Sequence, residues 1–299
     1  MSAPADSFAL TSRFTPPTSS EEDGVLCSAL LAKLRHELSE PGDDAARWSA
    51  EVGEFLIGLD LASGSAHRVE CLLAIAQYYY LGWRPAAALP AAERAVAQAR
   101  VLGDMALLRK ALTFLGVMRK ETGNLPEATA SFSEALETAQ RLGDAGAEAP
   151  VWNNLGVALQ NAAQYAEAIQ CFERAAALAD ASVAFAPVRA MALSNIASCA
   201  LHLRDVRTGI KAVRRAIELN PDPESATDCL SRVISESHYA RLLLEVGETG
   251  HATEHCEKAR MYAAKAPTAR AEFTASLTSG LIDVHSGRID VGLTRLQRS

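Results

Sequence analysis

The stretch APVWNNLGVALQNAAQYAEAIQCFERAAALAD, residues 149–180, decides the fold of this 299-residue chain. Its apolar residues recur at helical spacing, first around Trp152 and again around Phe172. A small residue at Gly156 allows two helices to approach closely, while Trp152 and Phe172 can fill the seam between them. The stretch therefore predicts a hairpin of two antiparallel helices.

The hairpin pattern repeats along the chain. A shift of 40 residues aligns small or apolar residues of three consecutive units at four positions, and further steps of 41, 43 and 40 residues extend the pattern. The aligned sets are Ile75, Leu115 and Leu155; Ala76, Gly116 and Gly156; Ala88, Ala128 and Ala168; and Ala95, Ala135 and Ala175. Six consecutive helical hairpins are therefore expected.

The stretch at residues 149–180 resembles the tetratricopeptide repeat (TPR). Trp152, Leu155 and Gly156 follow the spacing W-x2-L-G-x2-Y with Leu in the Tyr slot, and Ala168 with Phe172 follows A-x3-F. The period exceeds the usual TPR period of about 34 residues, and such long repeats resemble those of bacterial signalling and transcription-control proteins. The resemblance implies an all-α, TPR-type α-α superhelical solenoid of about six helical hairpins, preceded by a degenerate N-terminal helical cap.

The chain divides into three expected segments. Prolines and a Ser/Glu/Asp cluster near the N-terminus predict a disordered tail, because this composition buries too little apolar surface to offset its ordering entropy. The second helix of the last unit stops early, which suggests the N-terminal part of a longer protein. The expected segments are a tail at 1–22, a degenerate cap at 23–66, and a solenoid at 67–299 with units starting near 69, 109, 149, 190, 233 and 273, the last incomplete.

Composition excludes several classes of function. With 29 basic and 36 acidic residues the net charge is −7, which argues against nucleic-acid binding by this segment. The six cysteines form no C-x-x-C pair, as expected of reduced thiols in a cytoplasmic protein, and no apolar run is long enough for a membrane span. No catalytic or cofactor-binding motif occurs, so we expect neither an enzyme in this segment nor a cofactor.

The resemblance also implies a binding surface, because the first helix of each TPR unit lines a concave groove. Asn154 and Asn195 occupy the slot where peptide-binding TPRs place an asparagine. Pro150 and Met191 replace the basic residues of the clamp that binds two carboxylates, so that mode of recognition is not expected. The predicted groove residues are Gln77, Tyr80, Lys110, Phe114, Val117, Lys120, Asn153, Asn154, Gln160, Asn195, Ser198, His202 and Arg241.

Two further clusters are weaker candidates. His251 and His255 lie four residues apart on one predicted helix, a spacing that suits a metal pair, but no third ligand is identifiable and both are expected to face solvent. The aromatic run 78–80 with Trp83 could form a cradle, with Tyr79 in a core slot of the repeat.

The most direct functional hypothesis is a protein- or peptide-binding module that serves as a scaffold or as sensory input for signal transduction. The alternative is the N-terminal regulatory region of a longer bacterial signalling enzyme, a cyclic-di-GMP cyclase or phosphodiesterase, or of a transcription regulator. A third hypothesis is self-association by end-to-end stacking of the C-terminal unit, in which Ile289, Leu293 and Leu296 are expected to face the first helix.

Overall fold

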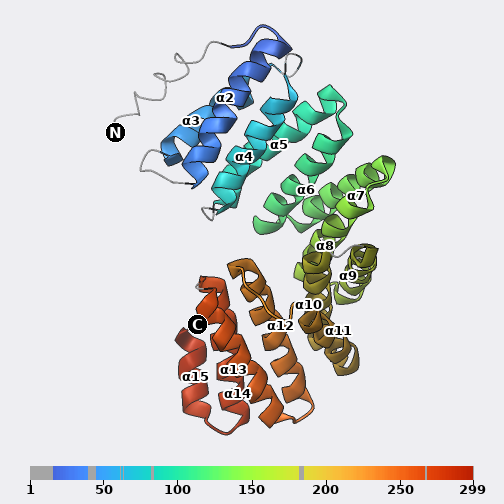
Figure 1. Ribbon diagram of the computed structural model, residues 1–299, viewed down its shortest axis with the longest axis vertical. Helices are drawn as coiled ribbons and strands as arrows, with labels where there is room; N and C mark the ends of the chain where they lie inside the picture. Colours follow the sequence, from blue (N-terminus) through green and yellow to red (C-terminus); the bar gives the residue numbers. More distant parts are fainter. Residues whose placement is uncertain are drawn as a thin grey trace. The chain divides into compact units, whose positions relative to one another are not determined.

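The computed structural model describes residues 16–39, 45–60, 62, 64–81, 84–181, 185–266 and 268–298, and within them it contains helices and no strand. The all-α prediction is thus confirmed. Residues 1–15 of the expected tail lie outside the described residues. The helices (Figure 1) are α2 (Ser20–Ser39), α3 (Ala45–Gly58), α4 (Ala66–Leu81), α5 (Pro85–Leu102), α6 (Met105–Glu121), α7 (Leu125–Leu142), α8 (Ala145–Asn161), α9 (Tyr165–Leu178), η1 (Ala179–Ala181), α10 (Ala186–Leu203), α11 (Val206–Glu218), α12 (Ala226–Glu245), α13 (Thr249–Lys265), α14 (Ala269–His285) and α15 (Ile289–Arg298).

The helices group into two compact units, Met1–Asp144 and Ala145–Ser299. In the first unit, α2 and α3 pack on the hairpin α4–α5, which packs in turn on α6–α7. The second unit contains the four hairpins α8–α9, α10–α11, α12–α13 and α14–α15. The six predicted hairpins are therefore present. Within each unit the first helices of successive hairpins contact one another, α4 with α6, and α8, α10, α12 and α14 in order.

Small residues at the repeated positions explain the close approach of each helix pair. A Cβ atom added at Gly116 would lie 2.6 Å from the ring of Phe132, and one added at Gly156 would lie 2.6 Å from the ring of Phe172. Both rings are fully buried. The glycine in the first helix is thus required by the aromatic side chain that the second helix places over it. The alanines of the aligned sets are likewise fully buried: Ala76, Ala88, Ala95, Ala128, Ala135, Ala168 and Ala175.

Local sequence sets the helix ends. Gly103 ends α5 in the left-handed conformation, and Asp104 caps α6 by accepting from the backbone N–H groups of its first turn. The turn inside each hairpin from α6 onward holds one residue at positive φ, at steps that follow the repeat. These residues are Gly123, Ala163, Arg204, Gly247 and Gly287.

The end helices differ in how they are held. α2 is joined to α4 by the fully buried pair of Asp23 and Arg68, in which Arg68 Nε donates to Asp23 Oδ1 over 2.7 Å. In α15, the expectation that Ile289 and Leu293 face the first helix is wrong, because their side chains are 55% and 49% exposed. Leu296 does pack on α14, where a Cβ atom added at Gly280 would lie 2.7 Å from the Leu296 side chain. No helix of the described residues has the length and apolar character that crossing a membrane requires.

Candidate functional site

The predicted groove residues of the first unit gather on α4 and α6. Gln77, Lys110 and Phe114 line one pocket of about 170 Å³, together with Glu70 and with apolar residues of α2 and α4. Tyr80 meets the ring of Phe114 edge to face, with 6.3 Å between ring centroids. The structure thus brings four of the predicted residues together, although they are 37 positions apart from first to last.

The two lysines predicted for this strip differ in their surroundings. Lys120 is mostly buried and its Nζ lies 2.6 Å from Glu121, so its charge is compensated within α6. Lys110 is exposed at the pocket and makes no ion pair with any residue that the structure describes. Val117 is half-buried between the two. A ligand of this pocket would therefore meet both a positive charge, at Lys110, and the carboxylate of Glu70.

In the second unit, amide side chains connect the first helices α8 and α10. Asn195 Nδ2 donates to Asn153 Oδ1 over 3.1 Å, and Gln160 Nε2 donates to Ser198 Oγ over 3.0 Å. Asn153 is buried, whereas Asn154 is half-buried and makes no hydrogen bond through its side chain with the described residues. Asn195 thus contacts Asn153, which lies one position before Asn154, the asparagine that the repeat pattern places in the peptide-binding slot.

The strip continues onto α12 through a residue that sequence reasoning missed. The ring Nδ1 of His238 lies 3.1 Å from the carbonyl oxygen of Ser194 and 3.3 Å from its hydroxyl oxygen. Burial lowers the pKa of His238 to about 4, and the charge of Arg241 acts in the same direction. His238 stands 43 residues after Asn195, so the repeat step used for the apolar positions could have found it.

The remaining predicted residues of this strip lie at its margins. His202 is exposed and stacks on the ring of Tyr165, with 4.4 Å between centroids. Arg241 is half-buried, and burial lowers the pKa of its guanidinium while the charge of Glu245 opposes that shift. The second strip therefore combines amide side chains and the neutral imidazole of His238 with a partly buried cation at Arg241.

The two histidines of α13 contact different carboxylates. His251 is exposed and lies 3.1 Å from Glu248, whereas His255 Nδ1 lies 2.5 Å from the fully buried carboxylate of Glu236. The expectation that both face solvent is wrong for His255, because α12 supplies a buried acid that the spacing on α13 does not reveal. Among the described residues no three metal-ligating side chains gather in one place.

The aromatic run on α4 divides between core and surface. Tyr79 is 8% exposed, as expected of a core slot, and Tyr80 is 37% exposed. Trp83 lies outside the described residues. Tyr80 is therefore placed to meet a ligand, next to the pocket that Phe114 lines.

Comparisons with known proteins agree with this architecture. Residues 107–181 match the sequence family described as Tetratricopeptide repeat. BtubC (BKLC) from P. vanneervenii has a similar crystal structure, with 16% identity over 83% of this chain and 92% of that chain and a TM-score of 0.60. No curated protein sequence matches the chain.

Two further solved structures are similar over most of the chain. The apo form of RapI is 13% identical over 91% of this chain and 95% of that chain, with a TM-score of 0.69. NprR in complex with its cognate peptide NprX is 13% identical over 92% of this chain and 77% of that chain, with a TM-score of 0.62. At these identities the likeness shows the fold alone, which is a TPR-type helical repeat.

Proposed function

We propose that this chain is a protein- or peptide-binding TPR module that acts as a scaffold or as sensory input for signal transduction. The observation that carries the proposal is the amide strip of the second unit, where Asn153 and Asn195 meet across two first helices. Each amide side chain has two N–H donors and one oxygen acceptor, so the contact between them uses only part of their capacity. Because Asn153 is buried, it is the remaining capacity of the half-buried Asn195 that suits a peptide backbone, which offers one donor and one acceptor per residue.

The fold supports this proposal because the first helices of each unit contact one another in series and so present a continuous row of side chains. NprR, a protein of similar fold, has been solved in complex with its cognate peptide. In the first unit, the pocket of Gln77, Lys110 and Phe114 is of a size to accept one side chain of a bound segment. Lys110 and Glu70 at this pocket can each pair with a polar or charged group of that side chain.

The proposal is tested with a displayed library of unstructured peptides, selected on the whole chain. The double substitution Asn154→Ala with Asn195→Ala should weaken the selected peptides by about tenfold or more, since each lost neutral hydrogen bond is worth roughly 1 kcal/mol. Asn161→Ala is the matched control, because Asn161 is an exposed asparagine at the end of the same helix α8. Circular dichroism should show the same helicity for all three proteins.

Equal binding by the double variant and the control would overturn the assignment of the strip. If Lys110→Gln alone weakened the selected peptides, binding would instead be assigned to the pocket of the first unit. The proposal includes a cytoplasmic location, for which the support is the spacing of the six cysteines.

A second candidate activity is self-association through the last hairpin. Three apolar side chains of α15, Ile289, Val291 and Leu293, are each about half exposed, and Phe273 of α14 is 48% exposed. Apolar surface of this kind favours contact with another protein surface. Sedimentation over a concentration series should show mass growth that Leu293→Lys abolishes, and a constant monomer mass for the unaltered chain would exclude this activity.

A further inference from the structure

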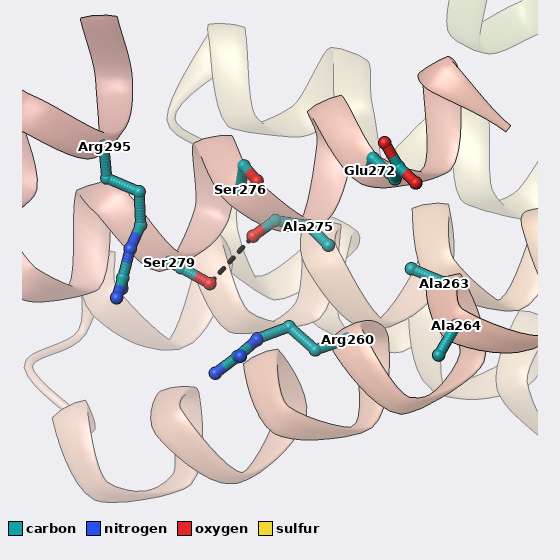
Figure 2. Close-up of a pocket in the computed structure, with 8 residues that line it drawn as sticks. All are labelled: Arg260, Ala263, Ala264, Glu272, Ala275, Ser276, Ser279 and Arg295. Carbon is teal, nitrogen blue, oxygen red and sulfur yellow. Dashed lines mark hydrogen bonds between the residues drawn. The ribbon is translucent and has the colours of Figure 1, made fainter. Parts of the chain in front are cut away.

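The last two hairpins form an open pocket that the proposed function does not use. It has a volume of about 490 Å³ and is lined by residues of α13, α14 and α15 (Figure 2). α13 and α15 are second helices of their hairpins, whereas the amide strip lies on first helices. A pocket of this volume falls within the range of small-molecule sites.

One end of the pocket is positively charged. Figure 2 shows the side chains of Arg260 and Arg295 extending toward the same end, where Ser279 also lies. Arg295 donates from Nη1 to Asp283, which leaves the other N–H groups of its guanidinium for a ligand. Arg260 is exposed and makes no hydrogen bond or ion pair through its side chain with the described residues. The two guanidinium groups together suit a carboxylate or a phosphate.

The charges of Arg260 and Arg295 both affect the pKa of a buried thiol next to the pocket, that of Cys256. Cys256 Sγ lies 3.1 Å from the hydroxyl of Ser279. Burial raises the pKa of the Cys256 thiol, while the hydrogen bond of Ser279 and the charges of Arg260 and Arg295 lower it in part. Both arginines therefore act at the place where Ser279 lies, which agrees with the view in Figure 2.

The other end of the pocket is negatively charged. Glu272 lies seven residues before Ser279 on α14, which corresponds to roughly 10 Å along the helix axis. Its carboxylate is exposed and has no partner among the described residues. Between the two ends, Ser276 offers a hydroxyl and three alanines of α13 and α14 offer small apolar surface.

We propose that this pocket binds a small zwitterionic ligand whose anionic end lies between Arg260 and Arg295 and whose cationic amine lies at Glu272. The opposite charges of such a ligand must be separated by roughly 10 Å, which three extended residues span at about 3.5 Å each. A peptide of about three residues with free termini meets this requirement. The small alanine side chains that line the pocket leave room for its backbone, and Ser276 can bond to it, whereas the hydroxyl of Ser279 donates to the carbonyl oxygen of Ala275.

The test uses the whole chain and calorimetric titration with trialanine as the probe. Unaltered protein should bind trialanine, and Arg260→Gln should weaken binding by about tenfold or more, because a charge-assisted hydrogen bond to the carboxylate is lost. Arg174→Gln is the matched control, since Arg174 is an exposed arginine on α9, outside the pocket. Arg260 is exposed as well, so neither substitution should alter the helicity.

Chemical variants of the probe separate the two ends of the pocket. C-terminal amidation should weaken binding to the unaltered protein and make Arg260→Gln almost without effect. N-acetylation should do the same for Glu272→Gln. Inorganic phosphate serves as a second probe. Its affinities for Glu272→Gln and for the unaltered protein should agree within about twofold, because Glu272 lies far from the anion end.

Several results would overturn the proposal. Absence of trialanine binding at millimolar concentration would do so, as would equal affinities for Arg260→Gln and Arg174→Gln. Equal binding of trialanine and its acetylated form would reduce the site to a simple anion site and reject the zwitterion. The result is independent of the amide strip, because Asn154→Ala with Asn195→Ala should leave trialanine binding unchanged.

Discussion

The hairpins α8–α9 and α12–α13 occupy equivalent positions in the repeat and are closed in different ways. In α8–α9 the ring of Phe172 lies over Gly156, and both residues are buried. In α12–α13 the corresponding residues are Ala240 and Cys256, both buried. The size of the two partners is thus complementary in each hairpin, a large side chain over Gly and a small one over Ala.

The hairpin α12–α13 also buries charge. Glu236 is fully buried and accepts from Arg232 Nε over 2.8 Å, and it lies 2.5 Å from His255 Nδ1. Arg232 donates as well to backbone carbonyl groups at and beyond the end of α11, among them that of Ile217 at 3.2 Å. The comparison teaches that one repeat geometry accommodates an apolar seam or a charged one, in which the buried carboxylate of Glu236 is paired with Arg232 and His255.

The largest expected effect comes from removing the buried acid. Glu236→Ala leaves the guanidinium of Arg232, which is almost fully buried, without its carboxylate, and breaking such a pair costs about 3–5 kcal/mol. Hydrogen exchange read by mass spectrometry should show α12 and α13 losing protection by that amount, and α8 and α9 losing less. Because both hairpins are measured in the same protein, a larger loss in α12 and α13 than in α8 and α9 identifies the destabilisation as local.

Glu254→Ala is the control for this substitution, because Glu254 is exposed on α13 and its replacement removes the same side-chain atoms. Its effect should stay within about 0.5 kcal/mol. If Glu236→Ala proved as mild as Glu254→Ala, the charge network would have no part in holding α12 on α13.

The next largest effect is on the apolar hairpin. Gly156→Ala places a Cβ atom 2.6 Å from the ring of Phe172, and overpacking of this kind costs about 1–3 kcal/mol. In a Phe172→Val background the same substitution should cost nothing, because it then reproduces the buried pair of Ala197 and Val213 in α10–α11. Denaturant unfolding of the four proteins gives the coupling energy.

Gly250→Ala is the matched control, since a Cβ atom at Gly250 meets nothing within 4 Å. This exposed helical position should gain up to about 1 kcal/mol, as expected when Ala replaces Gly in a helix. A loss at Gly250 as large as at Gly156 would mean that backbone effects, and not the ring of Phe172, determine the result.

The contrast between the two hairpins also explains what the sequence reveals. The apolar seam follows residue size at a fixed step, so Gly156 and Phe172 predict their own contact, as do the buried alanines of the aligned sets. The charged seam has no such signature. Arg232 and Glu236 lie four residues apart, which is also the spacing of an ordinary exposed ion pair, and only packing of α13 on α12 buries them.

The candidate site shows the same division. The first unit assembles Gln77, Lys110 and Phe114 because they occupy equivalent faces of adjacent first helices, which the repeat step specifies. The partner of Asn195 was not predictable, because a shift of one position between Asn153 and Asn154 depends on the rotation of α8 against α10. The arginine pocket was not predicted, because Arg260 and Arg295 belong to second helices, α13 and α15, whereas the groove prediction used first helices alone.

A smaller effect is expected from pH. The pKa of His238 on α12 is lowered to about 4 in the folded chain, against about 6.5 in the unfolded chain, so the unfolded state binds more protons between these values. The stability contributed by neutral His238 is complete above pH 6.5 and decreases as the pH falls toward 4. Between pH 6.5 and 5.5 the loss should be about 1 kcal/mol.

Glu236 adds to this effect at lower pH. Its burial raises the pKa, but the hydrogen bonds from His255 and Arg232 outweigh burial and lower it, so its contribution is lost only as the pH falls further. Hydrogen exchange, corrected for its intrinsic pH dependence, should show α12 opening before α8 on acidification. His238→Gln should remove the step between pH 6.5 and 5.5, and its persistence in that variant would assign the step to another group.

The smallest effect concerns the turns of the two hairpins. Ala163 in the α8–α9 turn has φ 59°, and Gly247 in the α12–α13 turn has φ 80°. A left-handed conformation strains any residue with a Cβ atom, so Ala163→Gly should stabilise α8–α9 by about 0.5–1 kcal/mol. Gly247→Ala should destabilise α12–α13 by a similar amount, because its added Cβ has open space and only backbone strain remains. Local hydrogen exchange should show these opposite signs, each in its own hairpin. Equal signs would mean that the unfolded-state entropy of glycine outweighs the strain, and the turn would then contribute nothing to the difference between the two hairpins.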